Sequence, residues 1–570
     1  MNVRLASLAG IFALAGLMLV ARVAYIQLVN DAQYKAEANN EHYGQQVVRA
    51  PRGAILDRNG YPLATTVDAY DVYINRADWK GDAAAQKGAA LIAPAIGQQP
   101  ADLIAAVRQQ PTGLYLAYSG LAFDKGTALE QTNAPGLRLA QTTVRSYPEG
   151  DLASNLLGFV GRDHTGLTGI EHDFDKELGG VPGTIYFERD SIGNRLSLGS
   201  ERVGQKPQPG GNIRLTIDRY IQRLVENELD AQIAKTGARG GTIIVMDPRT
   251  GAILAMASRP TFKLTQLNLS NPDQALFRNR AVTDVYEPGS VFKLITTSAA
   301  IDLGLVTPNS TYNDTGTALV NGVAIHNWDF SANGITSVAQ ILKKSLNTGA
   351  VWMSGLIGPD RFYQYAQRFG FGQATGVGLG GEPSGLLHTN HDANWSPVDL
   401  ATSSYGQGIA ATPLQVITAV SAIVNGGKLM RPYVVEQQDT PRGSRWTQPH
   451  VVRQAITAET AAQVADMMHQ VIDAPEDSLA RIAGWQAGGK TGTTTRVTLP
   501  GEGISDGTIA SFVGFAPLRN PQMVMLIKLD YANDQLGGIV AAPVFHDLAP
   551  SILNYLGIRP DTPAQVSSAP

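Results

Sequence analysis

Two groups of strand-like runs, separated by a long helix-compatible segment, constrain the fold of the C-terminal half more than any other feature. The runs are residues 242–246, 252–258, 491–497, 509–515 and 523–529. Connections within each group are short, which favours antiparallel pairing. We therefore predict one five-stranded antiparallel sheet flanked by helices, in a fold of the α/β (α+β) class. A helix from near Asp218 and another over 541–556 would cover one face, and the helical middle, 286–480, the other.

The N-terminal half predicts a separate, β-rich scaffold. Asn59-Gly60 is a strong hairpin-turn signal, 82–109 is alanine-rich with helical spacing, and 31–46 is polar and helix-compatible. A breaker cluster at 209–211 precedes a strand-like run at 212–216. We place a domain boundary there, which gives a non-catalytic domain over 29–210, a catalytic domain over 211–558 and a disordered tail over 559–570.

The N-terminus predicts a membrane anchor. Residues 5–21 form an uncharged apolar run between Arg4 and Arg22, which as a helix spans roughly 25 Å. Apolar residues up to Leu28 lengthen it, so we predict a transmembrane anchor over 5–28 that follows a short N-terminus, 1–4. A cleaved signal peptide is the alternative, but Arg22 and Val23 interrupt the small-residue pattern of a cleavage site. Charge alone leaves the orientation open, because the positive charges on the two sides of the span differ little: Arg4 and the terminal amine on one side, and Arg22 on the other.

Composition narrows the range of catalytic and binding groups that the chain can use. The 45 basic and 49 acidic residues give a net charge of -4, so no bulk charge points to nucleic acid. The chain has no cysteine, which excludes disulfides, thiolate metal sites and cysteine nucleophiles. Serine, lysine and carboxylate side chains must therefore carry any catalysis.

One Ser-x-x-Lys motif, Ser290 to Lys293, lies where Pro288 and Gly289 open a helix. Residues three apart share a helix face, so the lysine amine can lie beside the serine hydroxyl. A lysine buried near another cation loses proton affinity and can act as a base towards serine. The motif alone is weak evidence, because about two matches are expected by chance in a chain of this length.

Two further clusters strengthen the evidence from the Ser-x-x-Lys motif. Ser345-Leu346-Asn347 follows a helix-compatible run, 338–344, and a Lys-Thr-Gly-Thr cluster at 490–493 opens a predicted strand after small residues. The joint occurrence of three such motifs, in this order and context, is far more specific than any one of them.

Three other matches are rejected. A second Lys-Thr-Gly, at 235–237, falls at the end of an amphipathic helix, where the lysine meets the last carbonyls and the glycine caps the helix. The glycine-rich run 376–381 spells a dinucleotide fingerprint, but a loop follows it in place of a phosphate-binding helix. His388 and His391 have metal-like spacing without an evident third ligand, so solvated loop histidines are the preferred interpretation.

The three motifs resemble those of serine penicillin-recognising enzymes, in which Ser-x-x-Lys, Ser-x-Asn and Lys-Thr-Gly converge in one cleft. From about residue 22 to 557 the chain resembles class B penicillin-binding proteins, the monofunctional transpeptidases. Segments typical of the family are 52–60, 145–150, 169–171 and 215–218. Segments most similar to the septal, cell-division branch, in preference to the elongation branch, are 279–284, 382–385, 404–408 and 412–415.

This resemblance implies a role for each of five polar residues in the three motifs. Ser290 would be the acylated nucleophile, Lys293 its base and Ser345 a proton relay. Asn347 would hold the substrate's amide, and Lys490 would orient the relay.

The resemblance also implies a substrate-binding strand. Thr491 and Thr493 would bind the substrate carboxylate, and Gly492 would admit the peptide backbone. The backbone N–H groups of Ser290 and Thr493 would form the oxyanion hole. Tyr405 would wall the cleft.

The chain departs from its relatives at two of these places. Gln407 stands where some of them carry a second tyrosine of the aromatic wall. Leu346 departs from the Ser-Asp-Asn of class A β-lactamases.

The implied reaction is attack on the D-Ala-D-Ala bond of a peptidoglycan stem peptide, release of the terminal D-alanine and capture of the acyl group by an amine of a neighbouring stem. β-Lactams would be covalent inhibitors, and no metal or cofactor is required. Because this substrate lies outside the cytoplasmic membrane, the chain would be a single-pass protein with its N-terminus inside. The N-terminal half corresponds to the family's dimerisation-type pedestal and has no evident polymerase chemistry, so a polytopic glycan polymerase is the expected partner.

Alternatives on the same fold differ in the fate of the acyl group. A D,D-carboxypeptidase or β-lactamase would use water, but a β-lactamase needs no pedestal, and the Glu-x-x-Leu-Asn motif that could supply a class A deacylating glutamate is missing after the serine. A β-lactam sensor would call for more membrane spans than one. A catalytically idle scaffold is disfavoured because every polar member of the three motifs is present.

Overall fold

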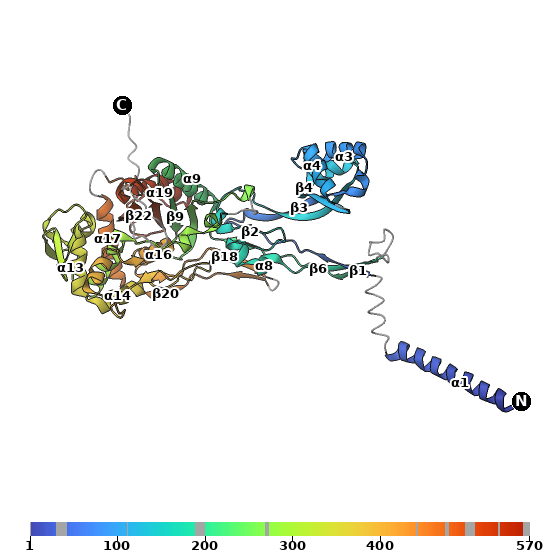
Figure 1. Ribbon diagram of the computed structural model, residues 1–570. Helices are drawn as coiled ribbons and strands as arrows, with labels where there is room; N and C mark the ends of the chain where they lie inside the picture. Colours follow the sequence, from blue (N-terminus) through green and yellow to red (C-terminus); the bar gives the residue numbers. More distant parts are fainter. Residues whose placement is uncertain are drawn as a thin grey trace. The chain divides into compact units, whose positions relative to one another are not determined.

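The computed structural model describes residues 2–29, 43–110, 112–188, 200–267, 273–440, 443–473, 478–495, 508–533 and 536–561 (Figure 1). Backbone contacts divide the chain into two compact units. One comprises Met1–Gly53 and Gly179–Gly210, and the other Ala54–Leu178 and Gly211–Pro570. Residues 562–570 of the predicted tail lie outside the described residues.

The predicted anchor is helical. Helix α1 (Asn2–Ala24) continues into a π-helical turn, η1 (Tyr25–Val29). Within this stretch, Val3–Leu28 is a candidate span of 26 residues with a mean hydropathy of 2.1 and no buried part. Length and composition therefore fit a single crossing of a membrane.

The remainder of the smaller unit is an antiparallel sheet in the order β1-β6-β7. Its strands are β1 (Tyr43–Val48), β6 (Gly183–Glu188) and β7 (Glu201–Gln205). The helix-compatible interpretation of 31–46 is wrong for residues 43–46, which pair with β6, and residues 31–42 lie outside the described residues. Pairing with a strand more than a hundred residues away overrides the local preference.

In the larger unit, the N-terminal part consists of strands with three helices packed beside them. The strands are β2 (Ile55–Leu56), β3 (Pro62–Asn75), β4 (Leu114–Ala122) and β5 (Leu137–Ser146), and the helices are α3 (Asp82–Ala95), α4 (Pro100–Gln109) and α5 (Phe123–Gln131). The predicted hairpin turn is confirmed, because Asp57 N donates to Tyr61 O at 2.8 Å and β2 pairs with β3 across it.

Short helices and a buried ion pair complete this part. The helices are α6 (Ser154–Leu157), α7 (Gly169–Asp173) and α8 (Asp175–Gly179). Arg145 Nε donates to Glu171 Oε1 at 2.6 Å, and both side chains are almost fully buried. Two family-like segments, 145–150 and 169–171, are therefore joined in the interior.

Strand β8 (Ile213–Leu215) connects this part with the C-terminal half. It pairs in parallel with β2 and antiparallel with β18 (Val435–Thr440), in a sheet of order β19-β18-β8-β2-β3-β4 to which β5 adds through β3. Strand β19 spans Gly443–Trp446. Residues 54–178, assigned to the scaffold domain from sequence, thus share one compact unit with the catalytic half.

The predicted five-stranded antiparallel sheet is confirmed, in the order β10-β9-β23-β22-β21. Its strands are β9 (Gly240–Met246), β10 (Ile253–Arg259), β21 (Gly488–Thr495), β22 (Thr508–Ala516) and β23 (Met523–Asp530). Sequence order differs from spatial order because β23 inserts between the early pair and the other late strands. Strand β21 is left at one edge of the sheet.

Helices cover both faces of this sheet, as predicted (Figure 1). On one face α9 (Arg219–Thr236) and α19 (Ala542–Tyr555) bury residues such as Leu229 and Phe545 against Phe512. The Asp218 carboxylate accepts from Tyr220 N and Ile221 N in the first turn of α9, and Gly237 ends the helix at φ 68°. On the other face, α16 (Pro413–Val424) packs with the rest of the helical middle.

The helical middle holds most of the motif residues. Its main elements are α10 (Arg280–Thr283), η5 (Gly289–Phe292), α11 (Lys293–Asp302), α12 (Val338–Lys344), α13 (Asn347–Ile357), α14 (Pro359–Arg368), α15 (Pro397–Ser403) and α17 (Ala458–Asp473). Small strand pairs are β11 (Thr311–Asp314) with β14 (Gly334–Ser337), β12 (Thr317–Val320) with β13 (Val323–His326), β15 (Leu386–Leu387) with β16 (Ile409–Ala410), and β17 (Lys428–Met430) with β20 (Val451–Gln454). Single helical turns outside the helical middle are η2 (Arg76–Trp79), η3 (Leu264–Gln266), η4 (Gln274–Phe277) and α18 (Gly537–Val540).

Candidate active site

Ser290 lies in a tight turn that leads into a buried helix. The predicted helix opening at Pro288 and Gly289 is a 3₁₀ turn, η5, which continues as α11 from Lys293. Gly289 has φ 55°, and its N–H donates to Gly406 O at 3.1 Å. A Cβ on Gly406 would lie 2.2 Å from Gly289 O, so only glycine fits there. The segment after α15 therefore fixes the turn that carries Ser290.

Lys293 is placed to act on Ser290. Its Nζ lies 3.0 Å from Ser290 Oγ, 2.6 Å from Ser345 O and 2.8 Å from Asn347 Oδ1. The side chain is fully buried. Burial, and secondarily the positive charge of Lys490, hold the pKa of Lys293 well below its usual range. A neutral amine that donates to the two carbonyl oxygens keeps its lone pair for the Ser290 proton.

Ser345 connects the two lysines. It ends α12 in a left-handed conformation, φ 57°, which turns the chain sharply before α13 begins. Its Oγ lies 3.3 Å from Lys293 Nζ and 3.0 Å from Lys490 Nζ. A hydroxyl between two amines can pass a proton from one side to the other.

Lys490 lies on edge strand β21 and is almost fully buried. Its Nζ donates to Thr491 O at 3.2 Å and contacts Thr491 Oγ1 at 3.4 Å. Burial lowers the pKa of Lys490 to about 7, so its proton is exchangeable near neutral pH. The structure thus brings together the five predicted catalytic side chains, Ser290, Lys293, Ser345, Asn347 and Lys490.

The following residues of β21 border the same site. Thr493 Oγ1 accepts a hydrogen bond from Gly537 N at 3.0 Å, which leaves its proton free to donate elsewhere. A Cβ on Gly492 would lie 2.4 Å from Ser511 Oγ and 2.9 Å from Pro288 O, so Gly492 lets the strand pass close to the serine turn. An edge strand of this kind can pair with an extended peptide.

Tyr405 lies in a small apolar cluster. Only 7% of its surface is exposed, and it packs with Ile325, Ala350, Val351 and Ala401. Burial, with a contribution from Glu287, raises the pKa of Tyr405 to about 12, so the phenol stays protonated. Its predicted place in the wall of the cleft stays a prediction.

Sequence reasoning missed Glu287, which precedes the serine turn. Its Oε1 accepts from Gly408 N at 2.7 Å, and its backbone oxygen accepts from Thr494 Oγ1 at 3.3 Å. Burial raises the pKa of the Glu287 carboxyl, against the opposing effect of the Gly408 hydrogen bond. Glu287 therefore joins the 404–408 segment, the serine turn and β21. No sequence motif marks such a link.

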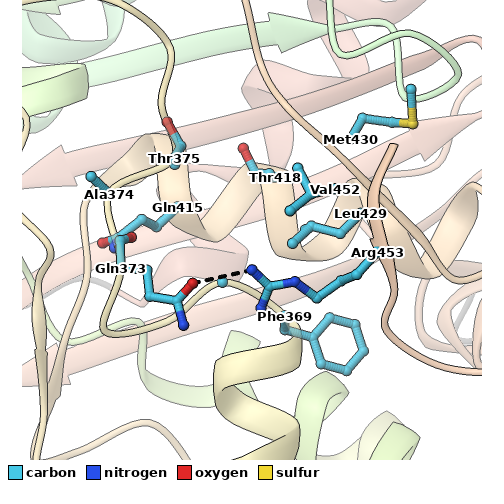
Figure 2. Close-up of a pocket in the computed structure, with 11 residues that line it drawn as sticks. Phe369, Gln373, Ala374, Thr375, Gln415, Thr418, Leu429, Met430, Val452 and Arg453 are labelled. Atoms are coloured by element: carbon cyan, nitrogen blue, oxygen red, sulfur yellow. Dashed lines mark hydrogen bonds between the residues drawn. The ribbon is translucent and has the colours of Figure 1, made fainter. Parts of the chain in front are cut away.

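The cavity drawn in Figure 2, about 40 Å³, lies elsewhere in the catalytic half. It is bordered by α16, by the segment after α14 and by strands β17 and β20, and Arg453 Nη2 donates to Gln373 Oε1 at 3.1 Å beside it. The described residues that line it include none of the five catalytic side chains.

The rejected sequence matches have ordinary structural surroundings. Lys235 is exposed in the last turn of α9. Glu382 folds the glycine-rich loop by accepting from Thr375 N at 2.7 Å and Gly376 N at 3.1 Å. His388 Nε2 lies 3.8 Å from Asp392 Oδ2.

Comparison with known proteins identifies two family regions. Residues 241–549 match the penicillin binding protein transpeptidase domain, and residues 47–215 match the penicillin-binding protein dimerisation domain. The first match contains every predicted catalytic residue.

Curated relatives match almost the whole chain. Stage V sporulation protein D of Bacillus subtilis is 31% identical over 95% of this chain and 84% of its own length. Peptidoglycan D,D-transpeptidase FtsI of Escherichia coli is 31% identical over 98% of this chain and 92% of its own length.

Solved structures agree in fold. Penicillin binding protein 3 of Mycobacterium tuberculosis, complexed with aztreonam, has a TM-score of 0.70 at 27% identity and covers 91% of this chain and 99% of its own. Penicillin Binding Protein 2X of Streptococcus thermophilus has a TM-score of 0.76 at 25% identity and covers 90% of this chain and 81% of its own. The motif geometry and these likenesses lead to one conclusion: the chain belongs to the class B penicillin-binding proteins and is a serine D,D-transpeptidase of peptidoglycan synthesis.

Proposed function

We propose that Ser290 forms the acyl-enzyme and that the residues around it share the proton transfers. Lys293 takes the Ser290 proton as Oγ attacks the carbonyl carbon of the D-Ala-D-Ala bond. The C–N bond breaks, the terminal D-alanine leaves with a proton delivered through Ser345, and the acyl group stays on Ser290. Lys490 orients Ser345 in this relay and resupplies it with a proton. The observation that carries the proposal is the 3.0 Å approach of buried Lys293 Nζ to Ser290 Oγ.

The second half of the cycle reverses these steps. An amine of a neighbouring stem peptide attacks the ester carbonyl, gives up a proton to the same relay and forms the cross-link, while Ser290 Oγ leaves and regains its proton from Lys293. Asn347, whose amide spans Lys293 and the 326 carbonyl, holds the substrate's amide in this scheme.

Substrate binding is proposed for edge strand β21. Thr491 and Thr493 bind the terminal carboxylate, and Gly492 lets the substrate backbone approach. The N–H groups of Ser290 and Thr493 form the oxyanion hole. The closeness of the serine turn to this strand supports the role, because a Cβ on Gly289 would lie 3.0 Å from Thr493 O. Tyr405 walls the cleft beside Glu287.

The domain division and location follow from the same reaction. We propose that residues 29–210 act as the non-catalytic pedestal and 211–558 as the catalytic domain. Stem peptides lie outside the cytoplasmic membrane, so the anchor has its N-terminus inside and the catalytic domain outside. A polytopic glycan polymerase supplies the strands that this chain cross-links. The septal branch is favoured by segments such as 279–284 and 404–408.

Labelling with a fluorescent penicillin tests the proposal. The purified chain lacking its anchor should become covalently labelled, and Ser290→Ala should abolish labelling without lowering the melting temperature, because the half-buried hydroxyl contributes little to the core. Undiminished labelling of Ser290→Ala would overturn the mechanism. A D,D-carboxypeptidase would release free stem peptide from a D-Ala-D-Ala donor even when an acceptor amine is in excess.

A further inference from the structure

A buried carboxylate outside the three motifs lies behind the Ser-x-Asn turn. Asp314 ends strand β11 and is 1% exposed. Its Oδ1 accepts from Thr348 Oγ1 at 2.8 Å, and its Oδ2 accepts from Asn333 Nδ2 at 2.7 Å and Asn327 Nδ2 at 3.0 Å. Burial raises the pKa of Asp314, but the hydrogen bonds from Asn333, Thr348 and Gly316 N outweigh it and lower the pKa below its usual value, so the carboxylate stays charged.

These partners lie at the start of helix α13. The helix begins at Asn347, and its N-cap, Leu346, has an apolar side chain that cannot cap it. Asn327, itself 1% exposed, accepts from Thr348 N at 3.3 Å through Oδ1. The amide oxygen of Asn327 thus takes the place of the missing side-chain cap, and the negative charge of Asp314 beside Thr348 is favourable at this end of a helix.

The same segment fixes the side chain of Asn347. Its Nδ2 donates to the backbone oxygen of His326, the neighbour of Asn327, at 2.9 Å. With the amide nitrogen held on this side, Oδ1 faces Lys293 Nζ at 2.8 Å. A rotated amide would present its N–H₂ group to the lysine and would remove an acceptor from it.

We infer that Asp314 is a positioning residue that, through Asn327 and Thr348, holds Asn347 with its amide oxygen towards Lys293. The hydroxyl of Tyr312 lies 3.0 Å from Thr348 Oγ1, so Thr348 can accept from Tyr312 while it donates to Asp314. Asp314 acts through these groups and does not contact Ser290 or Lys293. The inference rests on the proposed function, in which Lys293 serves Ser290 as its base.

Thr348 supplies the sharpest test, because it is buried and two variants separate its hydroxyl from its shape. Thr348→Val keeps the volume and removes the link, and Thr348→Ser keeps the hydroxyl. Acylation by a fluorescent penicillin, followed by stopped flow over a range of concentrations, yields the binding constant and the acylation rate constant separately. We expect Thr348→Val to lower the rate constant about tenfold, the equivalent of one lost hydrogen bond to a charged group, with little change in the binding constant. Thr348→Ser should restore most of the rate.

Asp314→Asn should slow acylation further, because its N–H₂ group would face the amide donors of Asn327 and Asn333. Asp329→Asn is the matched control. Asp329 is an exposed carboxylate between Asn327 and Asn333 in the sequence, and it accepts from Ser331 Oγ at 2.8 Å. We expect its acylation rate constant to be unchanged.

Two outcomes separate the inference from the proposed function. Equal rate constants for wild type, Thr348→Val and Thr348→Ser would overturn the inference alone. Should Asp314→Asn fail to fold, the Thr348 pair still decides. A wild-type chain that is not acylated at all would overturn the proposed function instead.

Discussion

Lys293 and Lys490 hold one hydroxyl between them: their Nζ atoms lie 3.3 and 3.0 Å from Ser345 Oγ. Both side chains are buried, and the charge of Lys490 adds to burial in lowering the pKa of Lys293. Two ammonium groups this close repel each other, so the neutral form of Lys293 is favoured when Lys490 is charged. In the proposed mechanism, Lys490 would therefore both complete the proton relay through Ser345 and favour the neutral form of the base, Lys293.

Lys490→Met should move the acid limb of the acylation profile to higher pH. Removing the neighbouring charge raises the pKa of Lys293, so a smaller fraction of it is neutral at a given pH. The rate at neutral pH should fall by at least tenfold, since residues that act as a unit are strongly interdependent. The measurement is the second-order acylation rate constant between pH 5 and 10.

Lys235→Met is the control for this experiment, because it removes the same charge from the second Lys-Thr-Gly. Its profile should match that of the wild type. If Lys235→Met lost activity while Lys490→Met kept it, the wrong lysine would have been assigned.

The pKa of Lys490 also predicts how stability depends on pH. Its value is about 7 in the folded chain and about 10.4 in an unfolded one, so between these values the unfolded state binds more protons. The contribution of this group to stability therefore increases as pH rises through 7 towards 10. Urea unfolding at pH 6 and pH 9 should show that this increment is smaller in Lys490→Met, and an equal increment in both chains would contradict the assignment.

Local signals account for what the sequence predicted well. Helix α9 has its cap at Asp218 and its stop at Gly237, each readable from neighbouring residues. The five strands of the catalytic sheet are marked by apolar runs and short links, and the spacing of Ser290 and Lys293 fixes their common side.

Long-range contacts account for the features of the fold and of the site that the sequence did not predict. Strand β8 joins β2 and β18, partners that no local pattern names. The close approach of Gly406 to Gly289, and the hydrogen bond from Thr348 to Asp314, join residues far apart in the chain. Glycine, threonine and aspartate are common in loops, so local sequence does not show which distant residue each of these positions contacts.

Gly406→Ala should abolish or severely slow acylation. The new methyl group would lie 2.2 Å from Gly289 O and push the serine turn away from Lys293, in addition to the strain of alanine at φ 82°, about 1–2 kcal/mol. Gly426→Ala is the matched control, because Gly426 has φ 62° with nothing within 4 Å of its Cβ position. The control should lose a similar amount of stability to strain and keep its rate. Equal rates in the two variants would show that the contact does not position Ser290.

Deleting residues 1–30 should give a protein that stays in solution without detergent and is acylated at the wild-type rate. The described apolar span ends at Leu28, and none of it is buried. Size-exclusion chromatography and penicillin labelling check this outcome. Loss of folding would mean that the span belongs to the core of the protein.

The orientation of the anchor can be read with single cysteines, since the chain has none of its own. Ser551→Cys, at an exposed position of α19, should react in intact cells with a maleimide that cannot cross the cytoplasmic membrane. Asn2→Cys should react only after that membrane is permeabilised. The reverse pattern would place the catalytic domain inside and exclude its proposed substrate.

The choice between septal and elongation roles requires a measurement of partner choice. Both branches would share Ser290, Lys293, Ser345, Asn347 and Lys490, so acylation cannot separate them, and fold cannot either. We expect partners to be selected through the anchor and pedestal. A fluorescent fusion that retains residues 1–210 should therefore concentrate at mid-cell, and depletion of the native protein should give filaments with incomplete septa. A fusion spread along the lateral wall, with depleted cells that become round, would assign the chain to the elongation branch.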